Sequence, residues 1–154
     1  MKKCPKCRGE MQVTPGEHPY RESGLPYVYL LNVPIATCTQ CGERTVGIPR
    51  MEELHRVIAE SVARRPARLG GAEIRFLRTH LGWSGKECAE RMGVTPETRS
   101  RWENGHSAPE IGHERLLRLA VLLTPIERPV DASILGSIAE IGRASCRERV
   151  YVLV

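Results

Sequence analysis

The sequence predicts an α+β protein, with a small β-rich half followed by an all-α half, and three observations support this class. Six prolines interrupt residues 1–49, and proline in a helix interior breaks the helix. Two Cys-x-x-Cys pairs lie within the same stretch, at a spacing typical of a small metal-stapled fold. From residue 72 onward, apolar residues recur with the periodicity of helices.

The two cysteine pairs are Cys4–Cys7 and Cys38–Cys41. A Cys-x-x-Cys turn places two thiolates where they bind one ion, and two such turns supply the four soft ligands of a closed tetrahedral zinc site. We therefore expect a structural Zn²⁺ ion held by Cys4, Cys7, Cys38 and Cys41. A closed site of this kind holds the fold together and has no open position for catalysis.

Cys-x-x-Cys pairs also occur in three other kinds of protein. A disulfide framework needs an oxidising compartment, whereas the chain begins Met1-Lys2-Lys3 without an apolar leader. A thioredoxin-like redox pair needs a Cys-x-x-Cys that opens a helix within a βαβ pattern, which the sequence does not show. An iron–sulfur centre also accepts four thiolates and stays open at this point.

The composition sets limits on the partners and on the core. The formal net charge of +5 fits a nucleic-acid partner but is weak support alone. Aromatic residues make up only 5% of the chain, so neither half can build a large core, and a metal would compensate. No apolar run approaches the ~20 residues that span a bilayer, and we expect a cytoplasmic protein without a membrane partner.

The β-rich half contains short runs of β-forming residues between and after the cysteine pairs, of which Tyr27 to Val33 is the richest. The pattern then changes to an amphipathic helix. We expect strands at 11–14, 18–22, 27–37 and 43–48, and a helix at 51–63.

A basic stretch containing Pro66 and Gly70 predicts a linker at 63–71. Beyond it, Ser84 and Glu87 form a capping box that begins a short helix. Two short helices joined by a tight turn are typical of a helix-turn-helix. We expect helices at 72–81, 84–93, 95–104 and 109–123.

The segment from Gly93 to Gly105, with its ending Ser-Arg-Trp-Glu-Asn-Gly, resembles the recognition helix of the repressor-like, XRE-type helix-turn-helix family. The helix from Ser84 to Met92 is similar to the first element of that family's motif. The resemblance covers about residues 72–123 and implies that double-stranded DNA is a partner.

By the family's pattern, Glu97, Thr98 and Arg101 point into the major groove. Arg101 suits either a guanine edge or a phosphate, and the hydroxyls of Thr98 and Ser100 suit phosphate or base contacts. Lys86 suits a phosphate. The candidate DNA-binding residues are Lys86, Glu97, Thr98, Arg99, Ser100 and Arg101.

Two of these positions depart from the family's pattern. Arg99 stands where the family has an aliphatic residue, and Gly85 replaces a common glutamine that helps to position DNA. An exposed arginine on a helix is often simply solvated. We expect Trp102 to pack in the core and Glu103 to form a pair within the domain.

A double Cys-x-x-Cys sheet followed by an XRE-type domain resembles the layout of the MqsA-type antitoxins, also described as YgiT-type zinc-finger proteins. The resemblance spans about residues 4–123, and the four cysteines match that family's zinc ligands. It implies a zinc domain that neutralises an RNase toxin, and a second domain that forms a homodimer, reads a palindromic operator and represses the operon. Glu97 stands where that family has an asparagine for base contact, so base preference is not carried over.

This layout divides the chain into a zinc-binding, partner-interaction domain, a linker, a helix-turn-helix domain and a tail, at 1–62, 63–71, 72–139 and 140–154. Free-standing regulation and a zinc-dependent protein-interaction module remain as alternatives. Catalysis is not expected, because four histidines sit singly without an acid partner or nucleophile at useful spacing: His55, His80, His106 and His113.

The two remaining cysteines have different interpretations. Cys88 falls mid-helix at an apolar position of the family's pattern, where a reduced cysteine packs as a small hydrophobe. Cys146 lies in residues 141–150, which resemble the translation of a common short-read sequencing adapter. The alternative for this tail is a basic amphipathic segment that binds nucleic acid.

Overall fold

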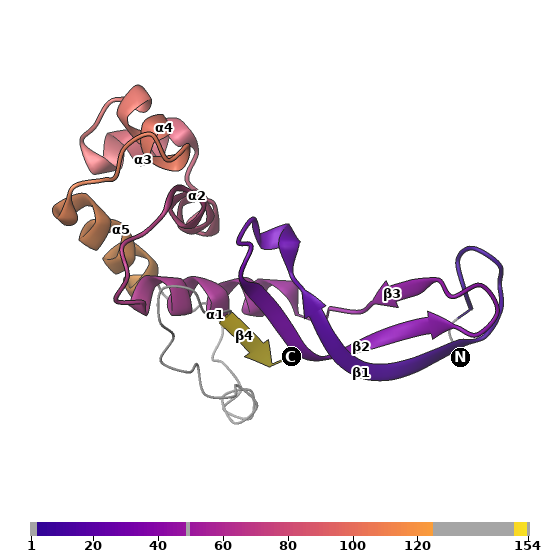
Figure 1. Ribbon diagram of the computed structural model, residues 1–154. Coiled ribbons are helices and arrows are strands. Elements are labelled where there is room, and N and C mark those ends of the chain that lie inside the picture. Colours follow the sequence, from indigo (N-terminus) through magenta and orange to yellow (C-terminus); the bar gives the residue numbers. More distant parts are fainter. Residues whose placement is uncertain (1–2, 49, 125–149, 154) are drawn as a thin grey trace. The chain divides into compact units, whose positions relative to one another are not determined.

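The computed structural model describes residues 3–48, 50–124 and 150–153 (Figure 1). The interpretation of Cys146 and of the tail before residue 150 therefore lies outside the described residues. The described chain forms two compact units. One contains the strands, and the other contains Arg21–Leu25 and the helices from Glu52 onward. The α+β class is confirmed, with an antiparallel sheet and cysteine cluster preceding five helices.

The first unit is a sheet in the order β1-β2-β3. β1 (Met11–Pro19) and β3 (Arg44–Val46) both pair antiparallel with β2 (Val28–Cys38). A further strand, β4 (Val150–Leu153), pairs in parallel with Val28–Leu31 of β2. The described part of the sheet therefore centres on β2.

Two of the expected strands turn out differently. The runs at 11–14 and 18–22 were predicted as separate strands, but residues 11–19 form one strand that includes Pro15. Proline is tolerated because β1 lies at the edge of the described sheet, where one of its sides needs no ladder hydrogen bonds. The chain then leaves the sheet, and Arg21–Ser23 form a 3₁₀ turn.

A bulge in β2 explains how its side chains form the core of this unit. The β1–β2 register shifts between Gly16 and His18, and Asn32 on the opposite strand has φ +60°. Asparagine adopts this left-handed backbone more readily than most residues. The extra residue resets the alternation, so that both Leu30 and Val33 are fully buried.

The described residues of the second unit form five helices, and the sequence signals are clearest at the ends of the third helix and at the start of the fourth. Ser84 and Glu87 form the predicted capping box, and Thr95 caps the next helix with Pro96 at its first position. Gly93 ends its helix in the left-handed conformation, with φ +67°. The helices are α1 (Met51–Arg64), α2 (Gly71–His80), α3 (Gly85–Met92), α4 (Pro96–Glu103) and α5 (Ile111–Leu123).

The expected linker at 63–71 is held by side chains of α5. The Arg118 guanidinium donates to the carbonyl oxygens of Ala63, Arg65 and Ala67. The buried Glu114 carboxylate accepts from Arg118 and from the backbone amide of Leu69. These residues therefore pack as part of the helical unit, together with α1.

Gly71 marks a close approach of two helices, which gives a stability prediction. A Cβ atom at Gly71 would lie 2.5 Å from the Glu103 carbonyl oxygen and 2.8 Å from that of Trp102. Backbone atoms cannot move aside as a side chain does, so Gly71→Ala should lower the free energy of unfolding by about 1–3 kcal/mol. Urea unfolding followed by circular dichroism measures this change.

Gly112→Ala is the matched control, because a Cβ at this helical glycine meets no atom within 4 Å. It should stabilise the protein by about 0.4–1 kcal/mol through lower entropy of the unfolded chain. Equal shifts for the two variants would contradict the close approach at Gly71.

Candidate metal centre and nucleic-acid interface

The two cysteine turns have the same local construction. The amide of Arg8 donates to the Cys4 carbonyl at 2.9 Å, and the amide of Gly42 donates to the Cys38 carbonyl at 3.1 Å. The residue after each pair has left-handed backbone, with φ +62° at Arg8 and +72° at Gly42. Glycine adopts this conformation without strain, whereas the arginine does so at a cost of about 1–2 kcal/mol.

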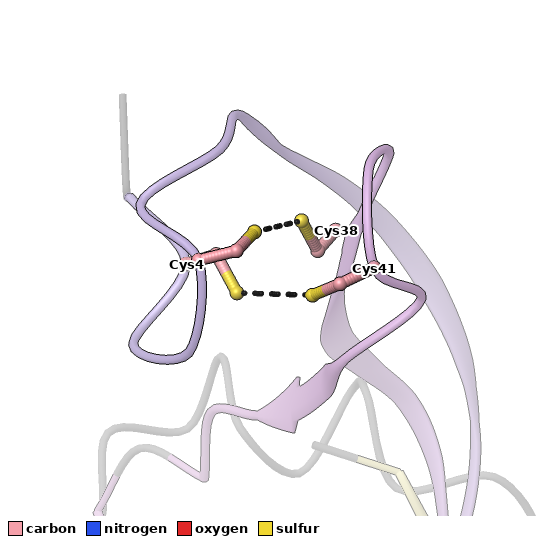
Figure 2. Close-up of side chains that lie close together, drawn as sticks. Cys4, Cys38 and Cys41 are labelled. Atoms are coloured by element: carbon pink, nitrogen blue, oxygen red, sulfur yellow. Dashed lines mark hydrogen bonds between the residues drawn. The ribbon is translucent and has the colours of Figure 1, made fainter.

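The four sulfur atoms face one another across the two turns (Figure 2). Cys4 Sγ lies 3.6 Å from Cys41 Sγ, Cys7 Sγ lies 3.4 Å from Cys38 Sγ, and all four lie within 4.8 Å of one another. A tetrahedral zinc ion with Zn–S bonds of about 2.3 Å holds its sulfurs about 3.8 Å apart. The four cysteines therefore fit a structural zinc ion.

The same spacing bears on the iron–sulfur alternative. The ligands of a multi-iron cluster must surround several metal ions, whereas these four sulfurs enclose the volume of one. The geometry favours a mononuclear tetrathiolate centre. Among the described residues, no histidine or carboxylate joins the group, so nothing in it provides an open catalytic position.

The thiols differ in how easily they ionise. The backbone amides of Cys41 and Gln40 donate to Cys38 and lower its pKa to about 6. At Cys7 the Gly9 amide acts in the same direction, but the neighbouring thiols, Cys38 first, outweigh it and raise the pKa to about 12. Four thiolates cannot gather here without a cation, so metal binding should release protons.

The helix-turn-helix is built on a small core within the second unit. Trp102 is buried, and the centroid of its ring lies 5.3 Å from the centroid of the His113 ring. The predicted core role of Trp102 is confirmed. Cys88 is also buried, as predicted. Gly93 makes the turn between α3 and α4, so that α4 takes the place of a recognition helix.

The candidate DNA-binding residues divide by exposure. Lys86, Glu97 and Arg101 are exposed, and Lys86 makes only a long surface pair with Glu90 at 3.9 Å. Thr98 and Ser100 are half-buried. The Thr98 hydroxyl bonds that of Thr95 at 3.1 Å, and the Ser100 hydroxyl accepts from the Asn104 side chain at 3.3 Å.

Arg99 differs from the other candidates because its guanidinium lies within the domain. Its side chain is only 18% exposed, and Nη1 donates to Glu103 Oε2 at 3.2 Å. The buried Glu103 also accepts from Arg78 at 2.6 Å and from Arg75 at 3.4 Å. The predicted pairing of Glu103 is confirmed, but its three arginine partners were not foreseen.

The arginines decide the ionisation of Glu103. Burial alone would raise the pKa of its carboxyl, but the hydrogen bond from Arg78 and the charges of Arg78 and Arg99 outweigh that effect. The pKa therefore lies below its usual range. Glu103 is a buried anion held by cations from α2 and α4.

Comparison with known proteins agrees with this geometry. Residues 74–123 match the family model described as Helix-turn-helix, and this matched segment contains α3 and α4. No curated protein matches the chain. The match supports a DNA-binding regulator of the XRE type that also carries a four-cysteine cluster fitting zinc. None of the described helices combines the length and apolarity needed to cross a bilayer.

The cysteine cluster predicts the metal content of the purified protein. Elemental analysis should find about one zinc ion per chain, and Cys38→Ser should lose most of it because one of four ligands is removed. Cys88→Ala is the control and should retain the metal, since Cys88 is buried in the other unit. Iron with visible colour, or equal metal in both variants, would contradict a zinc site at this cluster.

Proposed function

We propose that this protein is a cytoplasmic DNA-binding transcriptional regulator that acts as the antitoxin of a type II toxin–antitoxin system. Its helical unit represses its own operon, and its zinc unit neutralises an RNase toxin. The observation that carries the proposal is the pairing of a helix-turn-helix with a separate four-thiolate sheet. Each unit offers a different kind of binding surface.

We assign DNA recognition to α4, with a phosphate contact from Lys86 of α3. The Arg101 side chain is exposed and suits a guanine edge or a phosphate, and Lys86 suits a phosphate. Glu97 and Thr98 lie in the first turn of α4, the part of a recognition helix that meets base edges. A homodimer would place two such helices on a palindrome, with half-sites about 34 Å apart.

On the toxin side, the proposal rests on the chemistry of the sheet. A closed tetrathiolate ion stabilises a small fold and leaves the sheet's surface and edge strands for a protein partner. The resemblance to the MqsA-type layout supports an RNase toxin as that partner. A free-standing regulator with a structural zinc unit is the alternative, and the experiments below separate the two.

The DNA-binding part of the proposal predicts that the affinity for DNA depends on the salt concentration. The protein should bind a duplex from the region upstream of its own gene, and log K should fall linearly with log salt concentration. Arg101→Ala should weaken binding by about 10-fold or more, because a charge-assisted contact to base or phosphate is lost. Fluorescence anisotropy across a salt series measures both effects.

Arg115→Ala serves as the matched control, because Arg115 is an exposed arginine of α5 outside the two helix-turn-helix helices. It should retain affinity within about two-fold. A protein that binds the upstream duplex no better than a scrambled duplex, at any salt concentration, is not a sequence-specific regulator.

The antitoxin part predicts two separable losses. The protein encoded by the adjacent gene should inhibit growth when expressed alone, and co-expression of this chain should relieve that inhibition. Cys38→Ser should abolish the relief because the zinc unit loses a ligand of the ion that stabilises its fold. Arg101→Ala should keep the relief while losing repression of a reporter driven by the upstream region. If the adjacent gene encodes a harmless protein, the free-standing regulator is favoured. Relief that survives Cys38→Ser would instead contradict the assignment of toxin neutralisation to the zinc unit.

A further inference from the structure

Gly85 and Arg99 meet at the start of α3. A Cβ atom built on Gly85 would lie 2.6 Å from Arg99 Nη2 and 2.9 Å from Cζ. Contacts this short do not occur between real atoms, so the arginine occupies the space that any side chain at position 85 would need. The two departures from the family's pattern are therefore a single structural feature.

The ion pair with Glu103 determines whether the arginine can move aside. A guanidinium is the flexible end of a long side chain and normally yields to a neighbour. Here the Arg99 side chain is largely buried, and Glu103, four residues further along α4, is 4% exposed. Moving Arg99 away would separate it from a buried carboxylate, which is costly.

We propose that Gly85 and Arg99 form a compensating pair that seats α4 against α3, and that Arg99 positions the recognition helix without contacting DNA. The inference refines the proposed DNA-binding function by removing Arg99 from the set of candidate contacts. Glycine at the start of α3 leaves room for the arginine, whose guanidinium lies against α3 while it binds Glu103 within α4.

A double-mutant cycle on the zinc-loaded full-length chain tests the pairing. The variants are Gly85→Ala, Arg99→Met and the two combined. Methionine is shorter than arginine, lacks the guanidinium atoms that meet the new Cβ and has no charge with which to bind Glu103, so it can yield to the alanine. Thermal unfolding followed by circular dichroism gives the midpoint of each variant.

With Arg99 present, Gly85→Ala should lower the unfolding midpoint by about 2–5 °C and weaken binding of the upstream duplex about 5-fold. In the Arg99→Met background the same alanine should raise the midpoint, because its higher helix propensity then acts unopposed. A shift of the same sign and size in both backgrounds would overturn the pairing. Arg78 still binds Glu103 in every variant, which favours retention of the fold.

The salt dependence separates positioning from DNA contact. Arg99→Met should weaken DNA binding without changing the slope of log K against log salt, since no phosphate contact is lost. A slope reduced by about 0.9 would make Arg99 a phosphate ligand and would overturn the assignment. If the parent chain binds no DNA, the proposed function fails, while the unfolding cycle still decides whether Gly85 and Arg99 are coupled.

Discussion

Glu103 lies where α2 and α4 meet, and its carboxylate is almost completely removed from water. An isolated buried carboxylate costs several kcal/mol, so the arrangement is stable only with its cationic partners in place. Arg78 supplies the shortest hydrogen bond and also donates to the Trp83 carbonyl, beyond the end of α2. One arginine and one glutamate therefore connect α2, α4 and the segment that leads into α3. This connection holds α4 against α2 within the helical unit.

A second buried carboxylate repeats the arrangement elsewhere in the helical unit. Glu114 binds Arg68 and Arg118, and Arg118 donates to carbonyl oxygens at the end of α1 and in the segment after it. In the sheet unit the four cysteines have the same role, because they join two turns that are far apart in sequence. A chain with only 5% aromatic residues has few large apolar side chains for its two cores. Hydrogen-bonded ion pairs and the cysteine cluster then hold together segments that a larger core would otherwise join.

Local signals carried most of what the sequence predicted correctly. The cysteine turns, the Ser84 capping box and the Gly93 turn each depend on residues within a few positions of one another. The crosslinks between distant segments had no such signal. Arg118 and the carbonyls that it binds are more than 50 residues apart, so no local pattern indicates that α5 holds the stretch containing Pro66.

The strand errors have a similar origin, since the edge position that tolerates Pro15 is a property of the assembled sheet. For Arg99 the missing information was steric. The sequence showed an arginine in place of an aliphatic residue, but its burial depends on the absence of a side chain at Gly85. Gly85 and Arg99, each viewed alone, suggested an altered DNA contact. Only the short distance between position 85 and the Arg99 guanidinium shows that the two residues are connected.

The Arg99–Glu103 pair also limits the electrostatic attraction that the helix-turn-helix can exert on DNA. The segment from Ser84 to Ser107 carries equal numbers of basic and acidic side chains: Lys86, Arg91, Arg99 and Arg101 against Glu87, Glu90, Glu97 and Glu103. With Arg99 neutralised internally, few cations of this segment remain to replace counterions on the DNA backbone. Because non-specific binding depends on such replacement, this motif should bind random DNA weakly. Under the proposed function, specific affinity then comes from base contacts near Arg101 and from joining two copies of the chain on one palindrome.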